Sequence, residues 1–167
     1  IANKVFRSNV FDLKVGNEIK ITNPSTGQDE SHIVPEFDAI VSNLPFVAFE
    51  NISLDEKNAL AELVNKIKVD TGIELSKKSD LYTYIAAHLW SLLKEKGRVG
   101  LILSNSWLGT LSGKEFYVLL NKLYHVEYIL ISSKKRWFQN ADVVTTMIIL
   151  TKKSIDENPK DTRFGLL

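Results

Sequence analysis

Short apolar runs alternate with helical patterns through the middle of the sequence, and this alternation constrains the fold more than any other feature. Runs typical of strands lie at 37–41, 99–103, 126–131 and 143–150, and the three- and four-residue spacing typical of helices lies at 53–72, 79–96 and 113–124. Strands and helices that alternate through short connections indicate an α/β domain with three layers and a mostly parallel sheet. The first run, 37–41, has the apolar character of a covered strand.

Local signals set the boundaries of these elements. Ser53 and Glu56 form a capping box at the start of the first helix, and Gly72 marks its end. The second helix is expected to continue to Lys96. Only residues 132–141 separate the last two strands, which is too few for a helical crossover. We therefore expect these strands to form an antiparallel hairpin at the edge of the sheet.

The composition bounds the class of protein. The chain has 167 residues, of which 44% are hydrophobic and 25% charged, and such a chain is typical of one globular domain spanning 1–167. No apolar run reaches the roughly 18 residues that cross a bilayer, and the first ten residues do not resemble a signal peptide. A cytoplasmic protein without a membrane partner is predicted.

Cysteine and histidine usage excludes several kinds of chemistry. The sequence has no cysteine and three histidines, and the histidines are scattered without the spacing of metal ligands. Disulfides, thiolate nucleophiles and cysteine-based zinc sites are therefore excluded, and no metal site is predicted. The net charge of +1 gives no overall attraction to nucleic acid, so any such contact must be local.

The first strand runs into an unusual group of residues, Asn43, Leu44, Pro45 and Phe46. Ligands of open parallel sheets lie beyond the carboxyl ends of the strands, which is where these residues fall. Pro45 biases Leu44 toward an extended backbone that turns the Leu44 carbonyl oxygen away from the sheet. The Asn43 amide oxygen and this carbonyl would then form two acceptors for an exocyclic amine. The ring of Phe46 would lie against the heterocycle that carries the amine.

Two acceptors on one aromatic amine favour its methylation. The nitrogen lone pair of such an amine is delocalised into the ring, and hydrogen bonds from both amine hydrogens favour a pyramidal nitrogen whose lone pair can attack an electrophilic methyl group. Acceptors of this kind act mainly in the transition state. The alternative interpretation is a plain turn at the end of a strand, because asparagine and proline are common there.

Three segments together resemble a known enzyme family. They are "FDAIVSNLPF", "SDLYTYIAAHLWSLLKEKGRVGLILSNSWL" and "YILISSKKRWFQNADVVTTMIILTKK". In order and spacing they are similar to the catalytic domain of the amino-directed DNA adenine methyltransferases of bacterial restriction-modification systems, gamma-type. The similarity spans 37–153 and leaves 1–34 and 154–167 peripheral. It implies a Rossmann-like class I S-adenosylmethionine-dependent methyltransferase fold, S-adenosylmethionine as donor, and methylation at N6 of an adenine flipped out of double-stranded DNA.

The resemblance assigns roles around the target base. Asn43 and the Leu44 carbonyl would hold the amine, and Phe46 would stack on the flipped adenine. Phe138 falls where the family has a second aromatic ring against that base. Such stacking contributes roughly 1–3 kcal/mol per base, which offsets much of the cost of unstacking the nucleotide. A core aromatic that opens the last strand is the alternative for Phe138.

The resemblance also assigns residues near the methyl donor. Ile85 corresponds to a position that usually packs an aromatic ring on the donor's adenine, and an aliphatic side chain there keeps the contact. Either Asn9 or Asp12 corresponds to the acidic residue near that adenine. Leu44 replaces a proline of the family pattern, a change that preserves the backbone carbonyl.

The family pattern also includes a glycine-rich donor loop and an acidic residue that binds the ribose. Both are expected upstream of Asp12, and no such residues lie between Ile1 and Asp12. We therefore expect a partial domain that lacks its first strands and exposes an unpaired edge along 37–41. A fragment of a larger enzyme is favoured over assembly through that edge, and by itself it is expected to be inactive and to bind the donor negligibly.

A basic segment precedes the last predicted strand. Lys134, Lys135 and Arg136 are suited to contact phosphates beside the flipped base, and a solvated loop is the alternative. Double-stranded DNA is the predicted partner, with a specificity or endonuclease domain or subunit as a further partner. Lys152 and Lys153 are expected to mark the solvent-exposed end of the last strand.

Three functions remain open on these grounds. The first is DNA adenine-N6 methylation in a restriction-modification system. The second is methylation of another planar amine, an RNA base or a protein glutamine, because the same acceptors would serve it. The third is a DNA-binding remnant without catalysis, for which Leu44 and the missing donor loop are the arguments.

Overall fold

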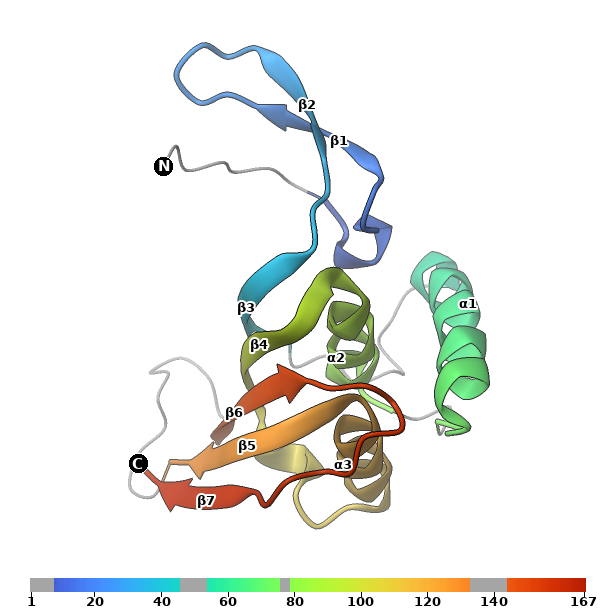
Figure 1. The fold of residues 1–167 in the computed structure, drawn as a ribbon, viewed down its shortest axis with the longest axis vertical. Helices are drawn as coiled ribbons and strands as arrows, with labels where there is room; N and C mark the ends of the chain where they lie inside the picture. The colour runs from blue at the N-terminus through green and yellow to red at the C-terminus, as the bar shows by residue number, and fades with distance from the viewer. Residues whose placement is uncertain (1–7, 46–53, 76–78, 133–143) are drawn as a thin grey trace.

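The computed structural model describes residues 8–45, 54–75, 79–132 and 144–167, and within 54–59 the backbone alone. Figure 1 shows the arrangement of the elements. In chain order they are η1 (Val10–Asp12), β1 (Glu18–Thr22), β2 (Asp29–Ile33), β3 (Phe37–Asn43), α1 (Leu54–Thr71), α2 (Leu81–Leu92), β4 (Leu93–Ser104), η3 (Asn105–Trp107), α3 (Leu111–Leu123), β5 (Tyr124–Ile131), β6 (Thr145–Lys152) and β7 (Arg163–Leu166).

The described strands form a five-stranded sheet of order β3-β4-β6-β5-β7 and a separate two-stranded sheet. β3 is parallel to β4 and β5 is parallel to β7, whereas β6 is antiparallel to both of its neighbours. Four of the five strands therefore run in one direction, and the predictions of a mostly parallel sheet and of an antiparallel β5–β6 pair are confirmed. The predicted position of this pair at the edge of the sheet is wrong, because β6 lies between β4 and β5, and β7 pairs with the other side of β5. β7 extends the sheet beyond this pair, an addition that the sequence pattern did not indicate.

The core lies between the sheet and its helices. Side chains on one face of β4 are fully buried, as Val99, Leu101 and Leu103 are all at most 1% exposed, and Ile148 and Leu150 of β6 lie beside them in register. They form one core with α2 and α3, which lie behind the sheet in Figure 1. α1 packs on α2 and α3. The described residues therefore contain two of the three predicted layers, the sheet and one layer of helices.

The second helix ends earlier than predicted. It stops at Leu92, and Leu93 already pairs with Phe37 as the first residue of β4. The chain then passes through Lys96 at a φ of 62°. At Gly97 a Cβ atom would lie 2.8 Å from the Lys94 carbonyl oxygen. Strand pairing thus overrides the helical spacing of 93–96. It needs a glycine at 97, because the chain there passes close to the Lys94 carbonyl oxygen.

β3 is an edge strand of the described sheet, as predicted. The expectation of a covered strand is wrong, because Asp38, Ala39 and Asn43 are exposed and Val41 is 86% exposed. Its helix-facing side chains, such as Ile40, are half-buried. The apolar run therefore indicated the strand correctly but not its burial.

The β1–β2 hairpin stands away from the five-stranded sheet (Figure 1). Its turn is held by the side chain of Asn23, whose Oδ1 accepts a hydrogen bond of 2.9 Å from the Ser25 N–H. Gly27, at a φ of 69°, returns the chain to the second strand. None of the described helices is long and apolar enough to cross a membrane.

Candidate functional site

The end of β3 is fixed by one backbone hydrogen bond and one buried side chain. Asn43 is paired with Ile102 of β4, and the Leu44 N–H donates to the Ile102 carbonyl at 2.8 Å. The side chain of Leu44 is only 2% exposed and packs in the core. Leu44 therefore holds the chain in place where the strand pairing ends.

Two polar groups at this point remain available. The side chain of Asn43 is exposed. No hydrogen bond reaches the carbonyl oxygen of Leu44 from any residue that the structure describes. The end of β3 thus presents a side-chain amide and a backbone carbonyl oxygen from adjacent residues, and both can accept hydrogen bonds.

A cavity of about 650 Å³ lies beside β3, and we call it the strand-end cavity. Its walls come from three places: residues 9–13 around η1, residues 37–45 of β3 and its end, and one face of α2. Four residues that the sequence analysis singled out line it together, namely Asn9, Leu44, Pro45 and Ile85. Asn43 is absent from the lining, although its neighbours Ser42 and Leu44 are part of it.

The structure separates the two candidates for the acidic donor position. Asn9 caps η1, since its Oδ1 accepts a hydrogen bond of 3.1 Å from the Phe11 N–H, and it lines the strand-end cavity. Asp12 lies at the other end of η1 and lines a different cavity. Asn9, rather than Asp12, therefore shares a cavity with Ile85.

Helix α2 supplies an aliphatic wall to the strand-end cavity. Leu81, Ile85 and Leu89 are spaced four residues apart and all line it, so they lie on one face of the helix. Ile85 is 6% exposed and Leu89 4% exposed. A flat apolar group can pack on this wall, and Asn9 offers an amide in the same cavity.

Two hydroxyl residues lie at the same end of the sheet, and of these only Thr145 was not singled out from the sequence. Ser104, the last residue of β4, pairs with Thr145, the first residue of β6. Ser104 Oγ accepts a hydrogen bond of 3.1 Å from the Ser106 N–H, and the buried Thr145 hydroxyl has no partner among the described residues. Both positions follow from the strand order, which local sequence patterns do not give.

Five further predicted site residues lie outside the described residues. They are Phe46, Phe138, Lys134, Lys135 and Arg136. Their proposed stacking and phosphate contacts stay predictions. Within the described part of the chain, no three histidine or acidic side chains converge as metal ligands would.

Comparison with known families identifies the chain. A family model described as Eco57I restriction-modification methylase matches residues 3–138. The chain belongs to this family of methylases. The matched range contains every residue named above for the strand-end cavity.

Solved structures agree with this family in fold. A putative class I S-adenosylmethionine-dependent methyltransferase from Listeria monocytogenes is 19% identical with a TM-score of 0.54, over 78% of this chain and 36% of that one. The methyltransferase subunit of a type I restriction-modification system from Streptococcus thermophilus is 21% identical with a TM-score of 0.52, over 77% and 26%. LlaBIII, an ATP-dependent type ISP restriction-modification enzyme bound to DNA, is 14% identical with a TM-score of 0.57, over 80% and 10%.

These likenesses show that the methylase chain has the class I S-adenosylmethionine-dependent methyltransferase fold, as predicted. The chain spans about a third or less of the length of each of the three proteins. A comparison with curated proteins gives no match.

Proposed function

We propose that this chain carries the methyl-transfer site of a DNA adenine-N6 methyltransferase of a bacterial restriction-modification system. The observation that carries the proposal is the end of β3. Asn43 is exposed there, and the adjacent Leu44 carbonyl oxygen accepts no hydrogen bond from the described residues. Family membership supports methylation, and the adenine specificity rests on this pair of acceptors.

In this proposal the two acceptors bind the exocyclic amine of a flipped adenine. Oδ1 of Asn43 and the carbonyl oxygen of Leu44 each accept one amine hydrogen. They would stabilise the positive charge that develops on the amine nitrogen as it bonds to the methyl group, whose bond to the donor's sulfur breaks with the electron pair left on sulfur. The amine would then lose its excess proton to water. Because such acceptors act mainly in the transition state, losing one is expected to slow transfer by about 10²- to 10³-fold.

The strand-end cavity fits the adenosine part of S-adenosylmethionine. Its volume of about 650 Å³ suffices for such a group, its α2 wall is aliphatic, and Asn9 adds an amide at the rim. Ile85 would pack on the donor's adenine ring and Asn9 would hydrogen-bond its edge. When bound, the donor supplies an electrophilic methyl group. Leu44 and Pro45 would keep the target amine beside that cavity.

The remaining predicted residues would bind the DNA around the flipped base. Phe46 and Phe138 would stack on the adenine, and Lys134, Lys135 and Arg136 would contact the flanking phosphates. Each phosphate contact is expected to contribute about 0.9 to the slope of log affinity against log salt. LlaBIII is a DNA-bound restriction-modification enzyme, which supports double-stranded DNA as the substrate and a recognition or endonuclease unit as the partner.

The test measures transfer of labelled methyl groups by the whole protein that carries this chain. Unmethylated duplex DNA, RNA and a protein extract are offered separately. Label in N6-methyladenine of DNA, lost at least about 10²-fold in Asn43→Ala and unchanged in the exposed control Asn65→Ala, is the expected result. Label confined to RNA or to protein glutamine would contradict the DNA substrate. DNA binding without any transfer would contradict catalysis.

A further inference from the structure

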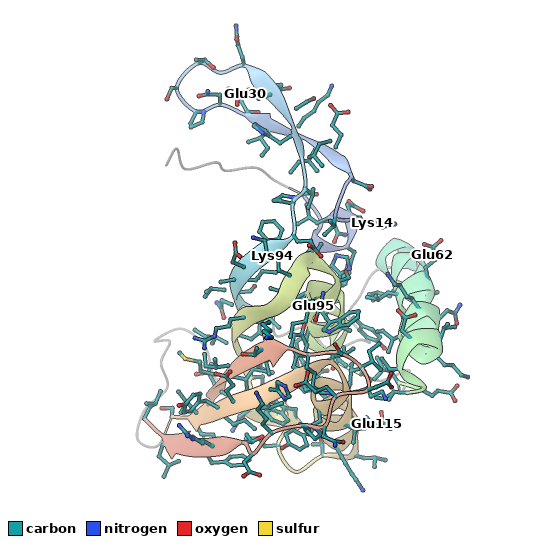
Figure 2. The ribbon with its side chains drawn as sticks, in the orientation of Figure 1. Lys14, Glu30, Glu62, Lys94, Glu95 and Glu115 are labelled. Atoms are coloured by element: carbon teal, nitrogen blue, oxygen red, sulfur yellow. The ribbon has the colours of Figure 1, made fainter. Side chains whose placement is uncertain are left out.

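The strand-end cavity has an almost entirely apolar lining. Among the described residues that line it, only Asn9 and Ser42 carry polar side chains, and none is charged. Figure 2 labels two lysines beside its walls, Lys14 after η1 and Lys94 on the strand next to β3, and neither belongs to the lining. Lys94 pairs instead with Asp38, at 2.7 Å. An anionic group in this cavity would lose its water without gaining a counter-charge, so the lining favours an uncharged ring.

The side-chain amide of Asn9 presents hydrogen-bond donors rather than acceptors. Its Oδ1 accepts a hydrogen bond of 3.1 Å from the Phe11 N–H and so caps η1. This bond also identifies the oxygen end of the amide, because an N–H group needs an acceptor. Nδ2 carries two hydrogens and forms no hydrogen bond with a described residue. The oxygen is therefore already used within the chain, and the hydrogens of Nδ2 remain for a ligand.

Ser42 brings a second polar group from another wall of the cavity. It lies on β3 immediately before Asn43, is half-buried and lines the cavity. Its hydroxyl makes no hydrogen bond with any residue in the described part of the chain. A hydroxyl both donates and accepts, and a partner offsets the cost of removing it from water. A ligand atom that bonds to this hydroxyl would therefore be favoured.

The hydrogens of Asn9 Nδ2 select one kind of atom on a purine. The ring nitrogens of adenine are acceptors, whereas its exocyclic amine brings hydrogens of its own. Because two donors cannot pair, Nδ2 can bond to a ring nitrogen but not to the amine hydrogens. An aspartate at this position would keep the cap and present only acceptors. It would therefore prefer the amine.

We propose that Asn9 and Ser42 determine which base the strand-end cavity accepts. Asn9 donates through Nδ2 to a ring nitrogen, and Ser42 bonds to a second polar atom of the same nucleoside. The exocyclic amine is then not required, so the cavity accepts adenosine and also purine riboside, which lacks that amine. This inference rests on the proposed use of S-adenosylmethionine, whose adenosine part would occupy the cavity, and it adds how the base is selected.

The experiment titrates the whole protein that carries this chain with single nucleosides and measures binding by calorimetry, without DNA and without methyl transfer. Adenosine and purine riboside should bind within about threefold of each other. The compounds 1-deaza-, 3-deaza- and 7-deazaadenosine each lack one ring nitrogen. One of them should bind about five- to tenfold more weakly than adenosine, which identifies the nitrogen that Asn9 contacts.

Asn9→Asp tests the donor directly, because aspartate caps a helix about as well as asparagine does. Purine riboside should bind at least about tenfold more weakly to this variant. Adenosine should lose less than about threefold, because its amine can donate to the new carboxylate. The control Asn17→Asp adds the same charge at an exposed position outside the lining, and it should leave both affinities within about twofold.

Ser42→Ala tests the hydroxyl, with Ser31→Ala on the exposed part of β2 as its control. Ser42→Ala should weaken the binding of both nucleosides about fivefold, and Ser31→Ala less than about twofold.

Several results would overturn the proposal. They are a preference of the parent for adenosine of about tenfold or more, equal binding of adenosine and every deaza compound, and no adenosine binding at about 10 mM. An unchanged ratio of the two affinities in Asn9→Asp, or an unchanged affinity in Ser42→Ala, would do the same. Nucleoside binding as expected without DNA methylation would contradict the proposed function alone. DNA methylation together with any of the overturning results would contradict this inference alone.

Discussion

The Leu44 N–H donates a hydrogen bond of 2.8 Å to the Ile102 carbonyl, while the Leu44 side chain is 2% exposed. This pairing fixes the backbone whose carbonyl oxygen we assign to the target amine. Family members have proline at this position according to the sequence resemblance, and proline cannot donate this bond. In this chain the buried leucine side chain therefore helps to restrain the backbone, as the rigid ring of a proline would.

Truncating the Leu44 side chain should lower the free energy of unfolding, although the backbone hydrogen bond to Ile102 remains. Leu44→Ala removes buried methyl groups and leaves a cavity, so we expect a loss of roughly 2–5 kcal/mol in the free energy of unfolding, measured in urea. The control is Val41→Ala on the same strand, where the side chain is 86% exposed and the loss should stay below about 1 kcal/mol. Similar losses in both variants would show that Leu44 does not anchor the strand end.

Local sequence patterns predicted the helices and strands but not the long-range contacts between them. The alternation of strand-like and helix-like spacing located these elements, and the residues after β3 indicated the candidate site. The burial of Lys152 and Lys153 was not predicted, and the expectation that they face water is wrong. Lys152 Nζ donates 2.6 Å to the Leu93 carbonyl, and Lys153 Nζ donates to the Glu157 carbonyl. The Lys152 bond joins two strands that are distant in sequence, so no local pattern encodes it.

β7 illustrates the same limit. Its four residues include Arg163 and Gly165, and they become a strand only because β5 offers a free edge next to them. The Arg163 guanidinium donates 2.9 Å to the Tyr128 hydroxyl of β5. A segment this short has no periodicity of its own. Its structure depends on a partner that the strand order, rather than the sequence, provides.

His88 should make the fold sensitive to mild acid. Burial lowers its pKa from the ordinary value of 6.5, so between the two pKa values the unfolded chain binds a proton that the folded chain does not. Stability is therefore lost as the pH falls below about 6.5, with a slope of at most about 1.4 kcal/mol per pH unit for one proton. Urea unfolding between pH 5 and 8 measures this slope. In His88→Gln the slope should be smaller, and an unchanged slope would exclude His88 as its source.

Glu157 should also make the fold less stable as the pH falls, but at lower pH than His88. Its carboxylate bonds to His125 Nε2 at 2.8 Å, and this hydrogen bond is the largest cause that lowers the pKa of Glu157 below its ordinary value of 4.5. The stabilisation is therefore complete above about pH 4.5 and is lost as the pH falls through the lowered pKa. Glu157→Gln should be less stable than the parent at pH 6, and the difference should shrink by pH 3. The exposed control Asp161→Asn should show no such convergence.

At Gly97, β4 passes close to neighbouring backbone atoms. A Cβ atom at this position would lie 2.8 Å from the Lys94 carbonyl oxygen and 3.1 Å from the Phe37 carbonyl oxygen, and neither backbone atom can move aside easily. We expect Gly97→Ala to cost roughly 1–3 kcal/mol in the free energy of unfolding. The control is Gly100→Ala three residues along the same strand, where the nearest atom to a Cβ would be a side-chain carbon of Ile149 at 3.6 Å. That variant should stay within about 1 kcal/mol of the parent protein. Because β4 pairs with β3, Gly97→Ala should also lower hydrogen-exchange protection in β3, and equal stability of the two variants would show that the turn at Lys96 can adapt.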